Sequence, residues 1–337
     1  MKVLFYVNYP LGWARGGSTV QIMESKKGLE KLGVEVSWLH HEDLAVPQSD
    51  IIHYWGRPPN DQHWQLAKKW GCKVVASDQN PQSVLRPRWT WRARGASSPI
   101  LKKIMGAGLY GTLGVGFYTG CDAVFVLSPY EQDYVHRVFK TPQSKLHVIP
   151  NGVDPIFLDQ SIRGLAFDGL VYIAYIRDIK NSIPVARAAK KQGVRVKFIG
   201  GIHSGEDSYA EVFKQEVDNK WVFWEGEVTD RGKLAALIRG SKGSFIAGQF
   251  EAQSISILES LASGVPVMMS GFPNLKSFYG NRITYCHPAD NARFPHELKA
   301  FYDNCGLGLK QIFPVLTWNQ VSERIAEIYQ SILNKKL

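Results

Sequence analysis

The feature that most constrains this fold is a repeated alternation of short, β-rich apolar runs with amphipathic stretches of helical length. The opening run at residues 3–7 is followed by a helix-like stretch at 20–32, which closes at Gly33. Such alternation is typical of a parallel sheet with helices on both faces. The pattern starts again near residue 170, and 337 residues suit two domains better than one. We therefore expect two successive α/β domains.

The expected elements can be given by range. In the first half the expected strands are 3–7, 34–39, 51–54, 73–76 and 123–127, with helices at 20–32, 62–70 and 129–139. In the second half they are strands 170–176, 194–199, 222–224, 244–247, 265–270 and 282–285, with helices at 184–192, 209–217, 233–239 and 254–263. A last helix at 318–333 carries one apolar face, formed by Val321, Ile325, Ile328, Tyr329 and Ile332, that requires a partner surface. With a turn-rich join at 150–155, we expect domains at 1–152 and 153–316 and a terminal helical segment at 317–337.

Cysteine usage and hydropathy favour a cytoplasmic protein. The four cysteines are scattered, which is typical of reduced thiols rather than of a disulfide frame or a zinc site. The apolar run at the start of the sequence is too short for a signal peptide. Residues 104–121 carry no charge and reach the length of a membrane span, but their six glycines make a poor helix. We expect that segment to pack within or upon the first domain.

The excess positive charge of the first half is concentrated in one stretch. No acid occurs between Asp78 and Asp122, whereas six cations do: Arg86, Arg88, Arg92, Arg94, Lys102 and Lys103. Trp89 and Trp91 alternate with these arginines. The composition suits phosphate groups or an anionic membrane surface, and an ordinary solvated loop fits it equally well. Peripheral contact of residues 86–103 with the inner face of a membrane is therefore one of two open interpretations.

Candidate site residues follow the strands, because ligands of doubly wound sheets bind at the carboxyl ends of strands. The first such loop holds Gly16 and Gly17, where the backbone can approach a ligand and a helix N-terminus favours an anion. The second holds Arg177 and Lys180, which can present two cations to one diphosphate. Each loop alone is weak evidence, since plain turns and exposed cations are common at strand ends.

The third and fourth loops add glycine turns and carboxylates. Glycine turns at 200–202 and 224–226, which include Gly200 and Gly226, could border a base or a sugar, and the nearby His203 could contact a phosphate or simply lie on the surface. Glu251 lies in the fourth loop, and Glu259 is expected about two turns into the next helix. The two carboxylates can therefore bind different parts of an elongated ligand, with a phosphate held between them by the N–H groups of Gln253, Ser254 and Ile255. A solvated helix residue at 259 and a capping neighbour at 251 are the alternatives.

The spacing of Glu251 and Glu259 resembles the E-x7-E signature of retaining glycosyltransferases of the GT-B fold, family four. This family includes bacterial mannosyl-, glucosyl- and N-acetylglucosaminyltransferases. The likeness extends over nearly the whole chain, through Gly16–Gly17, 50–53, 128–131, 149–157, Arg177 with Lys180, Gly200, 223–226, 262–267 and 318–329. It is carried by the order and spacing of these motifs together rather than by any single one.

The resemblance implies an architecture and a set of roles. It implies an α/β GT-B fold of two Rossmann-like, doubly wound domains, with a C-terminal helix crossing back to the first. Arg177 and Lys180 would neutralise the leaving diphosphate, helped by Gly16, Gly17 and the N–H groups of Ser254 and Ile255. Glu259 would bind the ribose, Glu251 the transferred sugar, and the loops at 200–202 and 224–228 the base.

The resemblance also implies the substrates. The donor would be a nucleotide sugar such as a UDP- or GDP-sugar, the acceptor a saccharide or a lipid-linked molecule, and transfer would retain the anomeric configuration. No DxD sequence is present, so we expect no bound metal and no other cofactor, and no nucleic-acid partner.

Three departures from the family pattern leave alternatives open. The histidine usual after the strand at 73–76 is replaced by residues 77–80, so Asp78 or Gln79 takes its place or the role is dispensed with. The spacing from Arg177 to Lys180 is shorter than usual, and the turn at 200–202 lacks the usual aspartate. A GT-B-fold sugar-nucleotide epimerase and a degenerate sugar-nucleotide-binding scaffold are the alternative functions, with a nucleic-acid binder a distant fourth.

Overall fold

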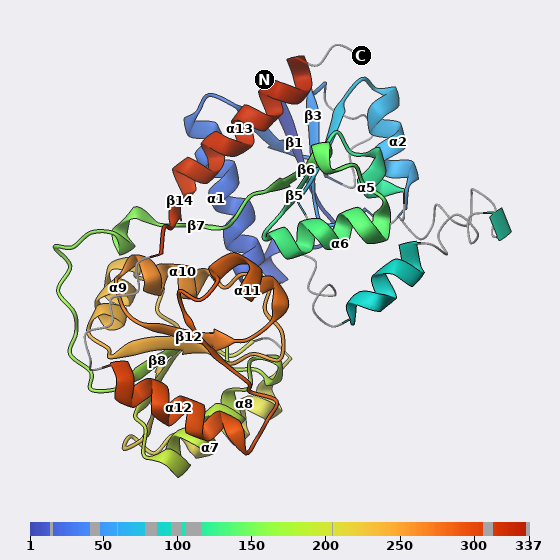
Figure 1. Cartoon of the computed structure of the whole chain (residues 1–337). Helices are drawn as coiled ribbons and strands as arrows, with labels where there is room; N and C mark the ends of the chain where they lie inside the picture. The colour runs from blue at the N-terminus through green and yellow to red at the C-terminus, as the bar shows by residue number, and fades with distance from the viewer. Residues whose placement is uncertain are drawn as a thin grey trace. The chain divides into compact units, whose positions relative to one another are not determined.

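The computed structural model describes residues 1–13, 16–40, 48–58, 60–77, 86–95, 103–104, 116–203, 205–305 and 313–334. The chain divides into an N-terminal unit, Met1–Gly152 with Trp318–Leu337, and a C-terminal unit, Val153–Thr317. Figure 1 shows that each unit has its own sheet with helices packed against it. Each unit is described below by itself.

The N-terminal unit is built on a six-stranded parallel sheet. Its strands are β1 (Lys2–Val7), β2 (Glu35–Trp38), β3 (Ile51–Trp55), β4 (Lys73–Ser77), β5 (Ala123–Val126) and β6 (Leu146–Val148), in the order β2-β1-β3-β4-β5-β6. Its helices are α1 (Gly17–Lys31), α2 (Gln62–Lys69), α5 (Phe117–Gly120), α6 (Pro129–Phe139) and α13 (Trp318–Asn334), with 3-10 turns η1 (Leu11–Trp13) and η2 (Gln143–Lys145). Residues 88–95 are also helical.

The C-terminal unit repeats this plan with a different strand order. Its strands are β8 (Leu170–Ile173), β9 (Val196–Ile199), β10 (Val222–Gly226), β11 (Gly243–Ile246), β12 (Val267–Ser270) and β13 (Thr284–Cys286), all parallel, in the order β10-β9-β8-β11-β12-β13. Its helices are α7 (Ser182–Gln192), α8 (Asp207–Glu216), α9 (Arg231–Arg239), α10 (Ile255–Ala262), α11 (Pro273–Tyr279) and α12 (Arg293–Asn304), with turns η3 (Pro155–Phe157) and η4 (Asp178–Lys180). The short strands β7 (Gly152–Val153) and β14 (Leu316–Thr317) pair with each other.

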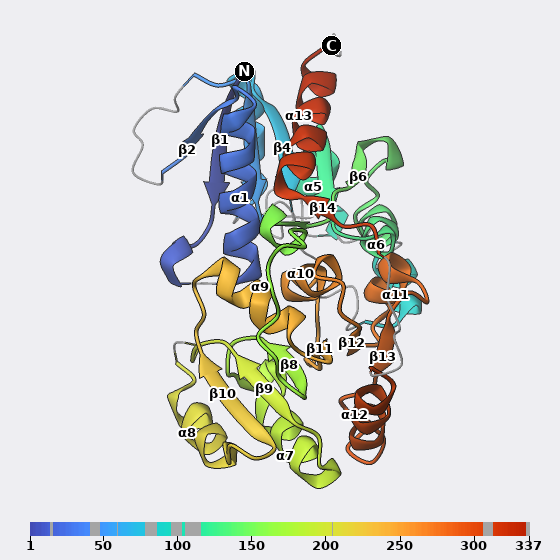
Figure 2. The same ribbon diagram turned by 90° about the vertical axis from the view of Figure 1, so that its left-hand side faces the viewer.

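The strand order of the C-terminal unit locates its binding edge. The chain passes from β8 outward to β9 and β10, and then returns to place β11 on the other side of β8, as Figure 2 shows. Loops leaving β8 and β11 therefore run in opposite directions and leave a crevice at the carboxyl ends of these two strands, the switch point at which ligands of doubly wound folds bind. Every residue of β11 and β12 is buried, as expected where helices cover both faces of a sheet. The predicted α/β class with two parallel-sheet domains is confirmed.

The C-terminal helix α13 packs on the N-terminal unit through the apolar face that the sequence shows. Its closest approach is to α1, where a Cβ on Gly28 would lie 2.1 Å from Ser322 Oγ. The hydroxyl of Tyr329 also makes a hydrogen bond with Nδ1 of His53, while His53 Nε2 lies 2.8 Å from Ser77 Oγ. Complete burial lowers the pKa of His53 to about 3, so this histidine is neutral and serves as a hydrogen-bonding part of the core.

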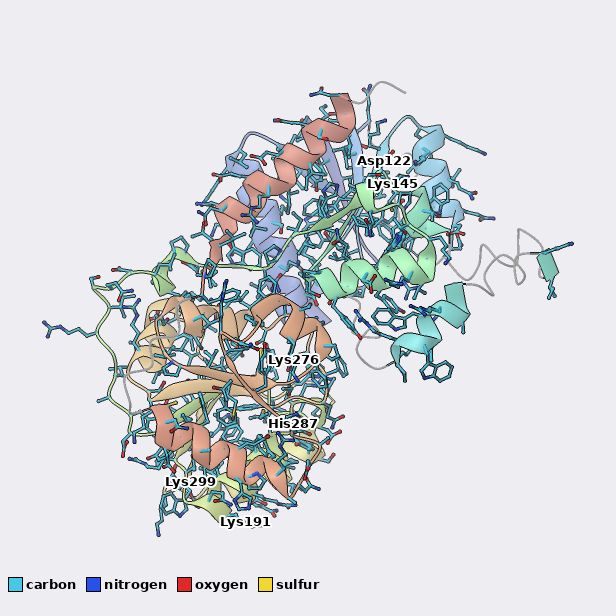
Figure 3. All side chains as sticks on the ribbon, in the orientation of Figure 1. Asp122, Lys145, Lys191, Lys276, His287 and Lys299 are labelled. Atoms are coloured by element: carbon cyan, nitrogen blue, oxygen red, sulfur yellow. The ribbon has the colours of Figure 1, made fainter. Side chains whose placement is uncertain are left out.

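Two predicted segments of the N-terminal unit can be compared with the structure in part. Of the uncharged stretch at 104–121, most residues lie outside the described ranges, but Phe117 and Tyr118 of α5 are fully buried. Asp122, labelled with Lys145 in Figure 3, ends the acid-free stretch, and its Oδ2 accepts a hydrogen bond from Val74 N at 2.8 Å. Within the part of the chain that is described, no helix combines the length and apolar character needed to cross a bilayer.

The basic stretch differs from its predicted form at one tryptophan. Trp91 is buried, with its ring edge-on to those of Tyr130 and Tyr134 at centroid distances of 4.9 and 5.1 Å, whereas Trp89 is 72% exposed. The guanidinium of Arg88 lies 5.1 Å from the ring centroid of Tyr130. Of the two tryptophans counted with this stretch, only Trp89 is therefore available to a surface, because the helix at 88–95 turns Trp91 into the core.

Candidate functional site

The candidate site lies at the carboxyl ends of β8 and β11 in the C-terminal unit. The loops that leave these strands are joined by hydrogen bonds: Asn181 Nδ2 donates to Ala247 O at 2.7 Å, and Gln249 N donates to Ile179 O at 2.9 Å. The hydroxyl of Tyr172, within β8, donates to the carbonyl of Lys180. These bonds fix two loops that are far apart in sequence as one rigid edge.

Lys180 and Glu251 meet across this edge. Lys180 Nζ lies 2.6 Å from Glu251 Oε1, and the two side chains are 25% and 6% exposed. Gly248 makes room for the carboxylate, because a Cβ there would lie 2.5 Å from Glu251 Oε1. Asn274 Nδ2 holds the carbonyl of Glu251 at 2.8 Å. Glu251 is thus a buried, ion-paired carboxylate in a fixed loop, which excludes the alternative that it is merely a capping neighbour.

The N-terminus of α10 opens beside this ion pair. Ser254 is the N-cap residue, but its side chain does not cap the first N–H groups of the helix. The Ser254 hydroxyl instead lies 2.9 Å from Ser256 Oγ. Ser256 Oγ in turn donates a hydrogen bond of 3.1 Å to the carbonyl of Ile173, the last residue of β8. Uncapped N–H groups and the helix dipole favour an anion at this position. The predicted backbone N–H donors of Gln253, Ser254 and Ile255 all lie at the start of α10.

Arg177 lies in the same loop as Lys180 but faces a different carboxylate. Its backbone is extended, its side chain is 30% exposed, and Nε lies 3.8 Å from Glu206 Oε1. Arg177 Nε is buried and makes no hydrogen bond to any described residue. A buried guanidinium N–H without a partner is costly, so an anionic ligand would satisfy it.

The predicted base-binding turns close the neighbouring strand ends. Gly200 has φ +154° and no room for a side chain, since a Cβ would lie 2.1 Å from Ala174 O. Its N–H donates to Gly226 O at 2.8 Å, and its carbonyl accepts from Trp224 Nε1 at 2.9 Å. Gly226 itself has φ +76°. Glycine is required at 200 and favoured at 226. The two turns tie β8, β9 and β10 together at one edge. Near them, the ring of His203 lies edge-on to that of Tyr175 at 5.9 Å.

Glu259 is buried and paired with an arginine that the sequence did not indicate. Because α10 begins at Ile255, Glu259 lies just over one turn into the helix, not two as expected. Its side chain is 4% exposed, and Oε1 accepts a hydrogen bond from Arg231 Nη2. Burial raises the pKa of Glu259 to about 7, although the Arg231 pair opposes the rise; the nearby Asp154 adds to it. Such burial excludes a solvated helix residue.

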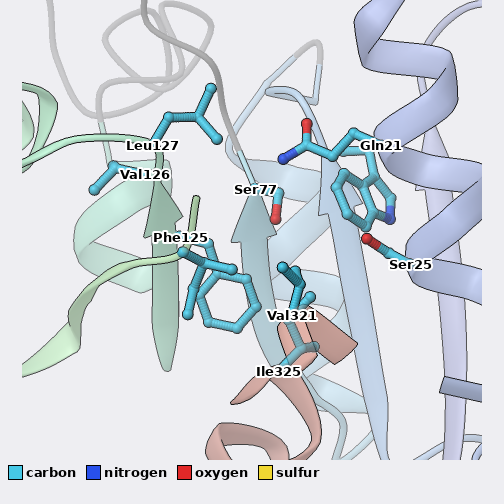
Figure 4. A pocket seen from close by; sticks show the side chains of 10 residues that line it. Gln21, Ser25, Ser77, Phe125, Val126, Leu127, Val321 and Ile325 are labelled. Carbon is cyan, nitrogen blue, oxygen red and sulfur yellow. The ribbon is translucent and has the colours of Figure 1, made fainter. Parts of the chain in front are cut away.

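The remaining predicted residues lie in the N-terminal unit. Gly16 is the N-cap of α1 in extended conformation, and Gly17 is the first residue of that helix, which no side chain caps. Asp78 and Gln79 lie outside the described residues, so the substitution for the family histidine stays a prediction. Ser77, which precedes Asp78, borders a cavity of about 10 Å³ between α1, the sheet and α13 (Figure 4). That cavity is too small for a sugar ring.

Two partners in the site could not be read from sequence spacing. Arg231 pairs with Glu259 across 28 positions, and Glu206 faces Arg177 across 29. The one local signal was Asp230, a helix-capping residue type, since it indicates that Arg231 begins a helix. The described residues contain no cluster of three or more His, Cys, Asp or Glu side chains that could bind a metal ion.

Comparison with known proteins gives a family match and a fold. Residues 38–157 match the profile of Glycosyltransferase Family 4. No curated protein matches the sequence significantly. A glycosyltransferase from Rickettsia africae is similar in structure, with a TM-score of 0.68 at 16% identity over 99% of both chains.

Two further solved structures superpose over the full length. Sucrose-phosphate synthase from Thermosynechococcus elongatus has a TM-score of 0.67 at 13% identity, covering 100% of both chains. HepE from Anabaena, crystallised with UDP and glucose, has a TM-score of 0.63 at 12% identity, covering 98% of this chain and 100% of that one. At these identities the structural likeness supports the fold alone, and the profile match extends over residues 38–157 of the N-terminal unit.

Proposed function

We propose that the chain is a glycosyltransferase, that its C-terminal unit binds a nucleotide-sugar donor, and that the enzyme transfers a hexose with retention of configuration; the match to the profile of Glycosyltransferase Family 4 and the GT-B fold of its structural neighbours support this proposal. The acceptor is a saccharide or a lipid-linked molecule, and no metal takes part. The observation that carries this proposal is the meeting of Lys180, Glu251 and the uncapped start of α10 at the β8–β11 switch point. This set of charges matches a sugar diphosphate.

The diphosphate is assigned to Lys180, Arg177 and the N–H groups of Ser254 and Ile255. Breaking the anomeric bond transfers negative charge to the leaving diphosphate, so groups that bind it more strongly as that charge grows lower the barrier. Two side-chain cations and a helix N-terminus supply fixed positive charge without a metal. The buried Nε of Arg177, which makes no hydrogen bond to a described residue, is consistent with this assignment.

The transferred sugar is assigned to Glu251. In the unliganded protein this carboxylate is neutralised by Lys180 at 2.6 Å. A diphosphate that takes the Lys180 ammonium frees one carboxylate oxygen, which can then accept hydrogen bonds from sugar hydroxyls. Phosphate and sugar therefore bind in a coupled manner, because each satisfies one member of the same ion pair.

The nucleoside is assigned to Glu259 and the glycine turns. Oε1 of Glu259 accepts a hydrogen bond from Arg231 Nη2, and we assign Oε2 to the ribose. A carboxylate oxygen is a strong hydrogen-bond acceptor, which suits a ribose hydroxyl. The base is assigned to the turns at Gly200 and Gly226. One solved structure of the same fold contains UDP and glucose, which favours a UDP-sugar as the first donor to test.

The acceptor side is assigned to the N-terminal unit and includes the basic stretch. Arg86, Arg88, Arg92 and Arg94 are exposed there, as is Trp89. We propose that this surface rests against anionic lipid on the cytoplasmic face of a membrane, so that a lipid-linked acceptor can reach the enzyme.

The proposal is tested by incubating the protein with UDP-, GDP- and ADP-sugars in the presence of EDTA. We expect one donor class to be hydrolysed slowly without acceptor, with release of free sugar and nucleoside diphosphate. If a nucleotide sugar is recovered as its epimer instead, the epimerase alternative is correct. If no nucleoside diphosphate or nucleotide sugar binds, the assignment of the C-terminal unit is wrong.

A further inference from the structure

Arg231 is a charged residue that lies next to the proposed nucleoside site and has no role in the function proposed above. It is the first residue of α9, immediately after the N-cap Asp230, whose Oδ1 accepts a hydrogen bond from Lys233 N at 3.0 Å. This cap fixes where the helix begins and therefore where the arginine side chain leaves the backbone.

The guanidinium of Arg231 is held from two sides. One face lies 4.7 Å from the ring centroid of Phe157, a buried residue whose carbonyl accepts a hydrogen bond from Arg239 at 2.9 Å. Its Nη2 donates to Oε1 of Glu259. A planar cation stacked on a ring and bonded at one edge has a defined direction, which a lysine ammonium would not have to the same degree.

Glu259 depends on this arginine for its charge. Its side chain is 4% exposed, and α10 carries no other charged residue. The groups that face it from the packed elements are Arg231 of α9 and Asp154, the N-cap of η3, while β11 and β12 supply no charged side chain. One cation therefore compensates a buried carboxylate that a second carboxylate repels, and such a carboxylate is strongly dependent on its partner.

We propose that Arg231 is a positioning residue for the donor: its guanidinium, stacked on Phe157, holds the carboxylate of Glu259 by Oε1 and leaves Oε2 directed to the nucleotide hydroxyls. This inference rests on the proposed function, because it assigns the nucleoside to Glu259. It adds a residue that touches no substrate but determines how strongly the nucleoside diphosphate binds.

The pairing of Arg231 with the buried Glu259 also predicts how nucleotide affinity responds to pH in an Arg231 variant. With Arg231 present, burial still raises the pKa of Glu259 to about 7. Without it the carboxyl is driven further toward its neutral form, so the ionised fraction at neutral pH falls and the apparent affinity falls with it. Raising the pH restores the ionised form, and therefore the defect of an Arg231 variant shrinks as pH rises.

The experiment is calorimetric titration of the full-length protein with UDP, GDP and ADP at pH 6.5, 7.5, 8.5 and 9.5. Arg231→Met keeps the aliphatic stem on Phe157 and removes the charge, and Arg231→Lys keeps the charge. Arg187→Met is the matched control, since Arg187 binds Glu216 at 2.7 Å elsewhere in the same unit. Ratios of variant to wild-type Kd cancel the ionisation of the nucleotide phosphate, whose pKa is about 6. Thermal melts confirm that each variant is folded.

We expect Arg231→Met to weaken the binding of the preferred nucleotide roughly tenfold at pH 7.5, with this ratio approaching one at pH 9.5. Arg231→Lys should recover most of the affinity, Arg187→Met should have no effect, and Arg231→Met should add nothing in a Glu259→Gln background. If Arg231→Met binds the nucleotide as tightly as the wild type or more tightly, the inference is overturned. It is also overturned if Arg231→Met loses the same affinity at every pH and still loses it in the Glu259→Gln background. A wild-type protein that binds none of the three nucleotides overturns the proposed function, and this inference with it.

Discussion

Replacing Glu259 by glutamine should stabilise the protein at neutral and alkaline pH while weakening nucleotide binding. In the folded protein, burial raises the pKa of Glu259 from 4.5 to about 7 against the opposing effect of Arg231. The folded state therefore binds more protons than the unfolded state between these two values. By linkage, the free energy of unfolding of the wild type falls as pH rises through this window and stays reduced above pH 7.

The magnitude follows from the size of the shift. At about 1.4 kcal/mol per pKa unit, a rise from 4.5 to about 7 costs the wild type about 3 kcal/mol once Glu259 is ionised in both states. Glutamine has nearly the same shape and does not ionise, so it removes this cost. It leaves Arg231 without an anionic partner, but that side chain is 40% exposed and water can solvate it. We expect about 2.5 kcal/mol of the relative stabilisation to develop between pH 5 and pH 8.

The assay is differential scanning calorimetry of wild type and Glu259→Gln at pH 5, 6, 7 and 8. For a unit of this size the difference in Tm should grow by roughly 5–10 °C across the series. Glu216→Gln is the control of opposite sign. Burial alone would raise the pKa of Glu216, but its hydrogen bonds to Arg187 and Lys190 outweigh this and lower it. That variant should lose stability by a similar amount at every pH of the series and recover only below about pH 4.5, because the pKa of Glu216 is lowered from 4.5 in the folded protein. A Tm difference for Glu259→Gln that is constant with pH would refute the reasoning.

Three further predictions concern catalysis and the membrane. Arg177→Ala should reduce kcat on the order of 10²–10³-fold with a smaller effect on donor affinity, because it removes charge stabilisation at the leaving diphosphate; full turnover in steady-state assays would show that the diphosphate is misplaced. Transfer should survive EDTA and yield a product of unchanged anomeric configuration by NMR, whereas rescue by magnesium or manganese, or an inverted linkage, would contradict the proposed mechanism. Full-length protein should sediment with anionic but not neutral vesicles, with a binding free energy of roughly 1 kcal/mol per contacting cation. Replacing Arg86, Arg88, Arg92 and Arg94 with serine should abolish this sedimentation; if it is unchanged, the basic stretch is only a solvated surface.

The sheets and the strand-end loops were predictable because they depend on local pattern. Strands such as 243–246 and 267–270 are mostly apolar and buried throughout, since both faces of a parallel sheet are covered. The candidate edge follows from the same pattern, because the carboxyl ends of parallel strands lie on one side. Helices α11 and α12 were not predicted: α11 has seven residues, and α12 carries Pro295 in its first turn, where proline is tolerated but its presence argues locally against a helix.

The pairing within the site was not predictable because it depends on strand order. Sequence gives the succession of strands but not that β8 lies between β9 and β11. That order brings Lys180 to Glu251, which is 71 positions away. The contact of Arg231 with Glu259 likewise requires α9 and α10 to be neighbours. For the same reason Trp91 could not be assigned to the core, since its partners Tyr130 and Tyr134 belong to a later helix.

The two signature carboxylates share one physical problem, and the fold solves it in two ways. Glu251 and Glu259 are 6% and 4% exposed, and a buried charged carboxylate is costly unless a compensating charge or hydrogen bonds stabilise it. Glu251 is compensated by Lys180, which the proposed donor needs for its diphosphate, so this pair must open when substrate binds. Glu259 is compensated by Arg231, which no substrate group is proposed to take, so this pair stays closed through the reaction. Because the Lys180–Glu251 pair opens when the diphosphate binds, binding of the sugar depends on the diphosphate. Because the Arg231–Glu259 pair stays closed, the contact of Glu259 with the nucleoside is equally strong in the ground state and in the transition state. Loss of the Lys180–Glu251 pair should therefore appear in kcat, and loss of the Arg231–Glu259 pair in nucleotide affinity.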